Sequence, residues 1–252
     1  MGDKPAFEII GSPLSDGPFL FSCEHASNRV PLGLQASGGD RHLLDDHWGW
    51  DIGAAALVSE LVDVLGGQGV ASTFSRLVID ANRPPSADSL IVGAIDGQSI
   101  SFNQAVDDAE RRRRVDEYFE PYHQAVTSVG RERAARTSPF HVISIHSFTP
   151  VYRGRQRDME IGVLFDDFDD DAERVGGALA GVGFKAALNE PYSGRGPGAL
   201  IYAAARHGNA LGRKYLELEI RQDLIADGAG QRDTAQRIAK ALSVFAPEST
   251  HD

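Results

Sequence analysis

The hydrophobic positions of the chain follow two different periods, which indicates a fold that combines strands with helices. Short apolar runs rich in β-branched and aromatic residues, typical of buried strands, occur at 18–22, 70–80, 141–148, 160–166 and 214–220. Helical spacing predicts helices over 52–65, 103–136 (with a break near Pro121), 169–182 and 198–208, and a final helix that buries Ala235, Ile238, Ala239, Leu242 and Phe245. Because strands alternate with helices, we predict an α/β fold with a mixed, mostly parallel sheet.

The sequence also predicts one domain. No linker, internal repeat or low-complexity block divides residues 1–252. Four consecutive arginines at 111–114 have acidic neighbours and are interpreted as a solvated helix face. The last residues, 247–252, are expected to fray.

Composition narrows the classes of protein to which the chain can belong. The formal net charge is −11 and 42% of the residues are hydrophobic, so we expect a soluble protein that does not bind nucleic acid generally. Cys23 is the only cysteine, which excludes an intrachain disulfide and a cysteine-rich zinc site. Neither a secretory signal pattern nor a run of about 18 apolar residues occurs. We therefore expect a cytoplasmic protein without a membrane partner.

Ionisable side chains follow several predicted strands, at the edge where α/β sheets bind ligands. His25 comes just after the strand at 18–22, and His146 lies near the end of the strand at 141–148. Two histidines with nearby carboxylates suit a zinc site that keeps one position for water. The simpler alternative is that each histidine is a hydrogen-bonded polar residue without a ligand. Neither an HExxH helix nor a GxSxG turn occurs, which excludes these two common hydrolase motifs.

A second group of polar residues surrounds the end of the predicted strand at 70–80. Arg76 lies within that strand, and Asn82 and Arg83 follow it. The planar guanidinium group of arginine suits a substrate carboxylate, and Asp80 is placed to orient either arginine. The alternative is a structural turn, closed by two prolines, in which arginine pairs with Asp80.

The strand at 214–220 carries two glutamates, Glu217 and Glu219, which alternate with apolar residues and therefore share one face. Such a face is often exposed to solvent. In an α/β sheet, however, both faces are usually covered. A carboxylate held there beside an activated water is a suitable general base.

Taken together, these segments resemble the N-formylglutamate amidohydrolase family. The resemblance is carried, in order, by CEHASNRVP, DDHWGWDIGA, SRLVIDANRPP, ISIHSFTPVY, GVLFD, NEPYSG and LELEIRQDLI, and it spans about residues 18–225. It implies a three-layer α/β/α sandwich of the phosphorylase/hydrolase-like type, similar to zinc carboxypeptidases and aspartoacylase. It also implies zinc-dependent cleavage of N-formyl-L-glutamate to formate and L-glutamate, a step of bacterial histidine degradation.

The resemblance further implies a set of metal ligands. His25 and His146 match the family's histidine ligands. In the carboxypeptidase relatives a glutamate lies three positions after the first histidine, but this chain has Asn28 there. We therefore expect Asp51, which matches an acid in the family's own motif, to be the third ligand. Glu24, Asn28 and His47 remain alternatives.

The other site residues follow from the same resemblance and from the loop at 189–198. Glu219 matches the catalytic glutamate, with Glu217 as the alternative, and Arg76 matches an arginine that polarises the scissile carbonyl. Residues expected to bind the carboxylates of a small anionic N-acyl amino acid, or to line the substrate pocket, are Asn82, Arg83, Tyr192, Arg195 and His207.

Two other functions stay open at this point. The chain could cleave another N-acyl amino acid or small amide by the same chemistry, or it could be a metal-free binding module on the same fold. Zn²⁺ is the expected ion, although Co, Mn or Fe suit the same nitrogen and oxygen ligands. The sequence does not indicate an oligomeric state.

Overall fold

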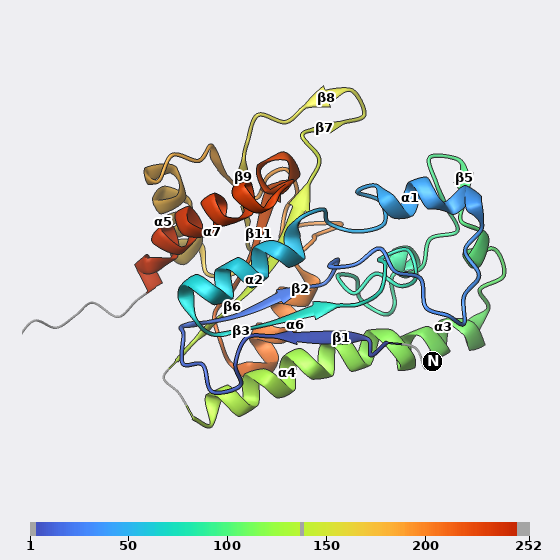
Figure 1. Ribbon diagram of the computed structural model, residues 1–252, viewed down its shortest axis with the longest axis horizontal. Coiled ribbons are helices and arrows are strands. Elements are labelled where there is room, and N and C mark those ends of the chain that lie inside the picture. Colours follow the sequence, from blue (N-terminus) through green and yellow to red (C-terminus); the bar gives the residue numbers. More distant parts are fainter. Residues whose placement is uncertain (1–3, 137–138, 246–252) are drawn as a thin grey trace, which may run out of the picture.

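A seven-stranded mixed sheet forms the centre of the protein, shown in Figure 1 as a computed structural model that describes residues 4–136 and 139–245. Four neighbouring strands run parallel, and β1, β9 and β10 run in the opposite direction. In spatial order the strands are β1 (Phe7–Ile10), β3 (Gln68–Ser72), β2 (Phe19–Cys23), β6 (His141–Phe148), β11 (Tyr215–Arg221), β9 (Ile161–Leu164) and β10 (Ala186–Leu188). Two short hairpins stand outside the sheet: β4 (Ala94–Ile95) with β5 (Gln98–Ser99), and β7 (Val151–Tyr152) with β8 (Arg155–Gln156).

Helices cover both faces of the sheet, which confirms the predicted three-layer arrangement (Figure 1). One face packs against α2 (Ala54–Leu65), α5 (Asp169–Gly181) and α7 (Gly228–Leu242), and the other against α4 (Glu120–Ala134) and α6 (Tyr202–Leu211). The apolar residues of β11 enter the first of these cores, while Glu217 and Glu219 are buried on the opposite side. Among the described residues, none of the helices has the length and apolar character of a membrane span.

Most predicted elements are present with small shifts at their ends. The predicted strands at 18–22, 141–148, 160–166 and 214–220 correspond to β2, β6, β9 and β11, and the helices at 52–65, 169–182, 198–208 and near the end of the chain to α2, α5, α6 and α7. The strands β1 and β10 and the two hairpins were not predicted, because segments of two to four residues carry too little periodicity. The expected fraying of 247–252 lies outside the described residues.

The predicted strand at 70–80 is wrong in its second half. β3 ends at Ser72, where its pairing with β1 and β2 ends, and residues 73–80 belong to no strand, with a turn over 76–78. The apolar residues at 77–79 are buried although they belong to no sheet, so a buried loop has the composition of a strand. Arg76 therefore lies in a loop beyond the carboxyl end of β3, not on the strand itself.

The polar helix predicted over 103–136 begins later and is distorted before Pro121. Its first part, α3 (Asp108–Arg114), follows Asp107, whose side chain caps it. A π-helical turn over Val115–Phe119 joins α3 to α4, and Glu120 N donates to the carbonyl at its start. Because proline lacks an N–H group, the predicted break takes the form of a local widening within a continuous helix.

The interpretation of residues 111–114 as a solvated face is wrong for Arg114. Its guanidinium group is buried and donates to Val78 O at 2.8 Å, to Phe102 O at 2.7 Å and to Asn103 Oδ1 at 2.6 Å. The helical period turns this one arginine of the run inward, where it fastens the loop after β3 to α3.

Arg114→Leu is expected to lower the free energy of unfolding by about 2–4 kcal/mol, because it leaves several buried acceptors without a donor. Arg112→Leu removes an exposed arginine from the same helix and should change that free energy by at most about 0.5 kcal/mol. Urea denaturation measures both variants, and equal losses would show that Arg114 does not fasten the loop.

Two buried histidines meet between α4 and α6. His123 Nδ1 lies 2.8 Å from His207 Nε2, and both rings are buried. Burial lowers the pKa of His207 to about 4, and burial together with the neighbouring His207 lowers the pKa of His123 well below its usual value. The pair is therefore neutral near pH 7. His207, which was expected to line the substrate pocket, instead belongs to this packing contact.

We expect His207 to make the protein less stable as the pH falls. Its pKa is about 4 in the folded protein and about 6.5 once unfolded, so the unfolded chain takes up a proton that the folded protein does not. The stability present above about pH 6.5 is lost as the pH falls towards 4, by about 2 kcal/mol between pH 7.5 and pH 5. Urea denaturation should therefore show a smaller loss in His207→Gln than in the wild type, whereas His42→Gln, at an exposed position, should follow the wild type. Identical losses in His207→Gln and the wild type would contradict this expectation.

Candidate metal centre and active site

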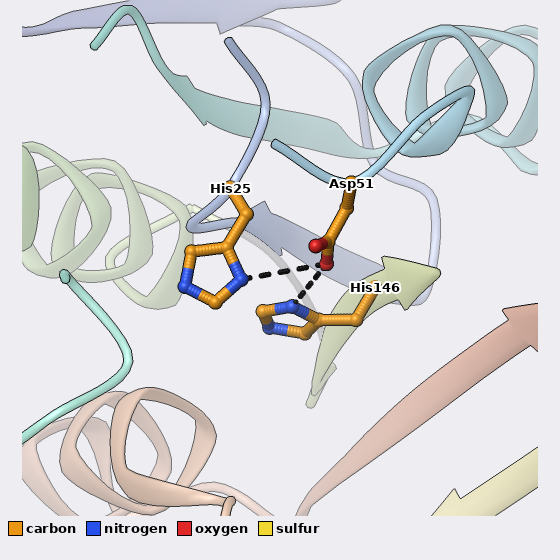
Figure 2. A group of neighbouring side chains, drawn as sticks. All are labelled: His25, Asp51 and His146. Atoms are coloured by element: carbon orange, nitrogen blue, oxygen red, sulfur yellow. Dashed lines mark hydrogen bonds and ion pairs between the residues drawn. The ribbon is translucent and has the colours of Figure 1, made fainter. Parts of the chain in front are cut away.

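The two histidines predicted as ligands lie next to each other where the neighbouring parallel strands β2 and β6 approach their carboxyl ends. Their ring centroids are 4.7 Å apart. The segment before α2 brings Asp51 against both rings: its Oδ2 lies 3.4 Å from His25 Nδ1 and 2.7 Å from His146 Nδ1 (Figure 2). Three side chains that are distant in the sequence therefore converge on one buried point.

The other nitrogen of each ring is held by a further carboxylate. His25 Nε2 lies 2.7 Å from Asp80 Oδ1, and His146 Nε2 lies 3.0 Å from Glu24 Oε2. Glu24 is itself fixed, since it accepts hydrogen bonds from Tyr122 OH at 2.7 Å and from Ser144 Oγ. A carboxylate on Nε2 keeps the proton there and leaves the Nδ1 lone pair for a metal, as in carboxylate–histidine–metal arrangements.

The charge around this point favours a cation. Five buried carboxylates surround the two rings: Glu24, Asp51, Asp80, Glu217 and Glu219. Burial alone would lower the pKa of His146, but the charge of Glu217 and the hydrogen bonds to Asp51 and Glu24 raise that pKa well above its usual value. In addition, His25 Nδ1 has only the 3.4 Å contact with Asp51 Oδ2 and makes no hydrogen bond within the described residues. Two imidazole nitrogens and one carboxylate oxygen fit a zinc-type divalent ion.

The alternative ligands occupy other positions. Glu24 lies behind His146 as its hydrogen-bond partner. Asn28 Nδ2 donates to Asp45 Oδ1 at 3.0 Å, and His47 Nδ1 lies 2.9 Å from Asp46 Oδ1. In the described parts of the chain, the ligand atoms that group together are those of His25, Asp51 and His146, within 4.8 Å of one another.

A cavity of about 280 Å³, which suits a small ligand, opens beside this group. His25, Asp51 and His146 line it, and so does Glu219. Burial, reinforced by the charge of Asp51, raises the pKa of Glu219 to about 7, and Glu219 Oε2 has no hydrogen-bond partner in the described part of the molecule. A carboxylate with such a pKa exchanges protons readily near pH 7.

Glu217 has a different environment. It does not line the cavity, and its Oε2 accepts a hydrogen bond from Asn82 Nδ2 at 3.2 Å. Burial raises the pKa of Glu217 well above its usual value, with a contribution from the charge of Glu219. The geometry therefore favours Glu219 over Glu217 as the group that reaches a substrate.

The loop after β3 brings two arginines to the cavity. Arg76 lies 3.4 Å from Asp51 Oδ1 and 3.2 Å from Asp80 Oδ2, while Arg83 makes only a long contact of 3.8 Å with Asp80. Asn82 also lines the cavity, but its Oδ1 accepts from Ala203 N at 2.9 Å and its Nδ2 is directed to Glu217. Arg83 is thus the better placed of the Asn-Arg pair to bind a carboxylate.

The loop at 189–198 contributes one of its two predicted residues. Tyr192 lines the cavity. Arg195 does not: its guanidinium lies over the ring of Phe165 and forms an ion pair with Asp169 at 2.6 Å. The structure therefore gives no support to Arg195 as a substrate ligand, because its charge is engaged at the N-terminus of α5.

Several residues that shape the site were not indicated by any pattern in the sequence around them. Tyr122, which orients Glu24, lies on a helix about a hundred residues further along the chain. The outer walls of the cavity come from Trp48 and from segments near 89–95 and 148–152. Asp80 was expected to orient an arginine, and its position next to Asn82 and Arg83 could also have suggested its contact with His25.

Comparison with known proteins agrees with this architecture. The chain aligns with the gene product Atu2144 from Agrobacterium tumefaciens with a TM-score of 0.86 and 33% identity, over 96% of both chains. It shares the fold of the N-formylglutamate amidohydrolase from Ralstonia eutropha JMP134, with a TM-score of 0.72 and 19% identity, over 96% of this chain and 97% of that one. Among curated proteins, no match is found.

A comparison with family sequences identifies the same relationship. The sequence model described as N-formylglutamate amidohydrolase matches residues 17–226, a stretch that contains all the residues of the metal centre and the cavity described above. The chain therefore belongs to the N-formylglutamate amidohydrolase family.

Proposed function

We propose that the protein hydrolyses the amide bond of N-formyl-L-glutamate, or of a similar N-acyl amino acid, in a metal-dependent reaction. One observation carries this proposal: Glu219 lines the same cavity as the grouped ligand atoms of His25, Asp51 and His146. The products from N-formyl-L-glutamate are formate and L-glutamate, as in histidine degradation. The acidic charge and the buried, unbridged Cys23 support a cytoplasmic enzyme that acts on a small molecule.

In this proposal His25, Asp51 and His146 hold a zinc ion or another transition metal suited to nitrogen and oxygen ligands. When bound, such an ion acidifies water and polarises a carbonyl group. Asp80 and Glu24 serve the reaction indirectly, since they fix the two imidazole rings. Hydrogen bonds from the Arg76 side chain and from Asn82 N keep the Asp80 carboxylate in place.

Glu219 accepts the proton of the attacking water and then gives it to the leaving amine. A carboxylate does both most efficiently when its pKa lies near the working pH, and burial raises the pKa of Glu219 in that direction. Arg76, which lines the same cavity, donates a hydrogen bond to the developing oxyanion. Arg83 binds the substrate carboxylate and so orients the scissile bond.

Metal analysis tests the ligand set. After loading with zinc and dialysis, the wild-type protein should retain about one ion per chain, and His146→Ala and Asp51→Ala should retain far less because only two ligands remain. His47→Ala alters a cavity residue outside the ligand group and should retain the ion. A wild-type protein that retains no zinc, cobalt, manganese or iron would instead favour a metal-free binding module.

The role of Glu219 is tested by substituting each glutamate of β11 in turn. Glu219→Gln should keep the metal and reduce formate release by about 10²–10⁴-fold, because the proton acceptor is lost. Glu217→Gln should reduce it much less, since Glu217 does not line the cavity. Formate release from N-formyl-L-glutamate and bound zinc are measured together. Full activity in Glu219→Gln would move the role of base to another residue.

A further inference from the structure

One side of the cavity is built from apolar side chains. We define this apolar wall as Trp48, Leu77, Val92, Ile95 and Tyr152, all of which line the cavity. Leu77 is buried in a small core, and Trp48, Val92 and Ile95 pack against the same core. The ring of Tyr152 lies 6.2 Å from that of Trp48 and extends the wall to the β7–β8 hairpin, which projects from the sheet (Figure 1).

Two of the arginines near this wall are already paired with carboxylates. Two arginines line the cavity, and Arg76 is bound by Asp51 and Asp80. At the tips of the hairpins, Arg153 pairs with Asp96 at 2.7 Å.

Arg157 does not line the cavity. Its guanidinium lies 5.5, 4.8 and 5.1 Å from the ring centroids of Phe148, Tyr152 and Tyr192, three residues that do line it. Among the described arginines and lysines, Arg83 is thus the one that lines the cavity with its donors largely uncommitted. The cavity offers a cationic partner for one substrate carboxylate.

We propose that the preferred substrate is an N-acyl amino acid with a single carboxylate, whose remaining large group is apolar and packs on the wall of Trp48, Leu77, Val92, Ile95 and Tyr152. This inference rests on the proposed amide hydrolysis and names its substrate class. A second carboxylate, as in N-formyl-L-glutamate, would be removed from water against this wall with no second uncommitted arginine or lysine among the described lining residues to pair with it. An apolar group there gains from burial instead.

Two test substrates carry an apolar group, each on a different side of the amide bond. N-formyl-L-leucine carries it on the amino-acid side, and N-hexanoylglycine carries it on the acyl side. N-formylglycine lacks it, and N-formyl-L-glutamate replaces it with a carboxylate. We expect kcat/KM of the zinc-loaded enzyme for at least one of the two apolar compounds to exceed the values for both references by about tenfold or more. The better of the two identifies the side of the amide that faces the wall.

A charge placed on the wall gives an independent test. Ile95 is only partly buried in the β4–β5 hairpin, so Ile95→Lys supplies a cation without opening the core. This variant should raise the ratio of kcat/KM for N-formyl-L-glutamate to that for N-formyl-L-leucine by about tenfold or more. Val64→Lys, at an exposed position of α2 away from the cavity, should leave the ratio unchanged.

The outcomes separate this inference from the proposed function. If N-formyl-L-glutamate is the best of the four substrates, the inference is wrong and the proposed hydrolysis stands. If none is hydrolysed, the proposed function fails, and calorimetric binding of the same compounds to zinc-loaded Glu219→Gln then decides the inference. Tightest binding of N-formyl-L-glutamate would overturn it, and tightest binding of an apolar compound would support it.

Discussion

The contacts of His25 Nε2 with Asp80 and of His146 Nε2 with Glu24 fix the two imidazole rings, and the rest of the site depends on their orientation. A carboxylate beside the outer nitrogen of each ring favours a proton there, and the Nδ1 atoms of both rings lie beside Asp51 Oδ2. Without these partners the rings could rotate and the three ligand atoms would no longer face one point. The partners are themselves held: Glu24 by Tyr122 and Ser144, and Asp80 by Arg76 and by Asn82 N.

The fold provides this arrangement through the parallel centre of the sheet. Neighbouring parallel strands end at the same edge, so the residues after β2, after β3 and along β6 and β11 meet there without long-range adjustments of the chain. The loop after β3 has no such register to place it. Arg114 helps to place the loop: it lies on α3 and donates to Val78 O, with further bonds to the segment at 102–103. Backbone hydrogen bonds from the loop to Arg29, Gly49 and Leu90 add to this.

The difference between what could and could not be predicted follows from the range of the interactions. Strand periodicity and the position of His25 and His146 after apolar runs are local properties, and they led to the right sheet edge and to two side chains that do converge. The strand at 70–80 was extended too far because a loop buried by neighbouring segments has the same apolar composition as a strand. Arg114 was misjudged for a similar reason, because the groups that it binds lie elsewhere in the chain. The ion pair of Arg195 with Asp169 also joins distant residues and has no local signal. The contact between Glu24 and Tyr122 depends on packing between layers, which no local pattern encodes.

We expect His25, His146 and Asp51 to share one divalent cation. The most direct measurement is a pair of anomalous difference maps from zinc-loaded crystals, recorded on either side of the zinc absorption edge. We expect a single peak, present only above the edge, bonded to the Nδ1 atoms of both histidines and to a carboxylate oxygen of Asp51. A peak bonded to other residues, or Asp51 turned away from the ion, would contradict it.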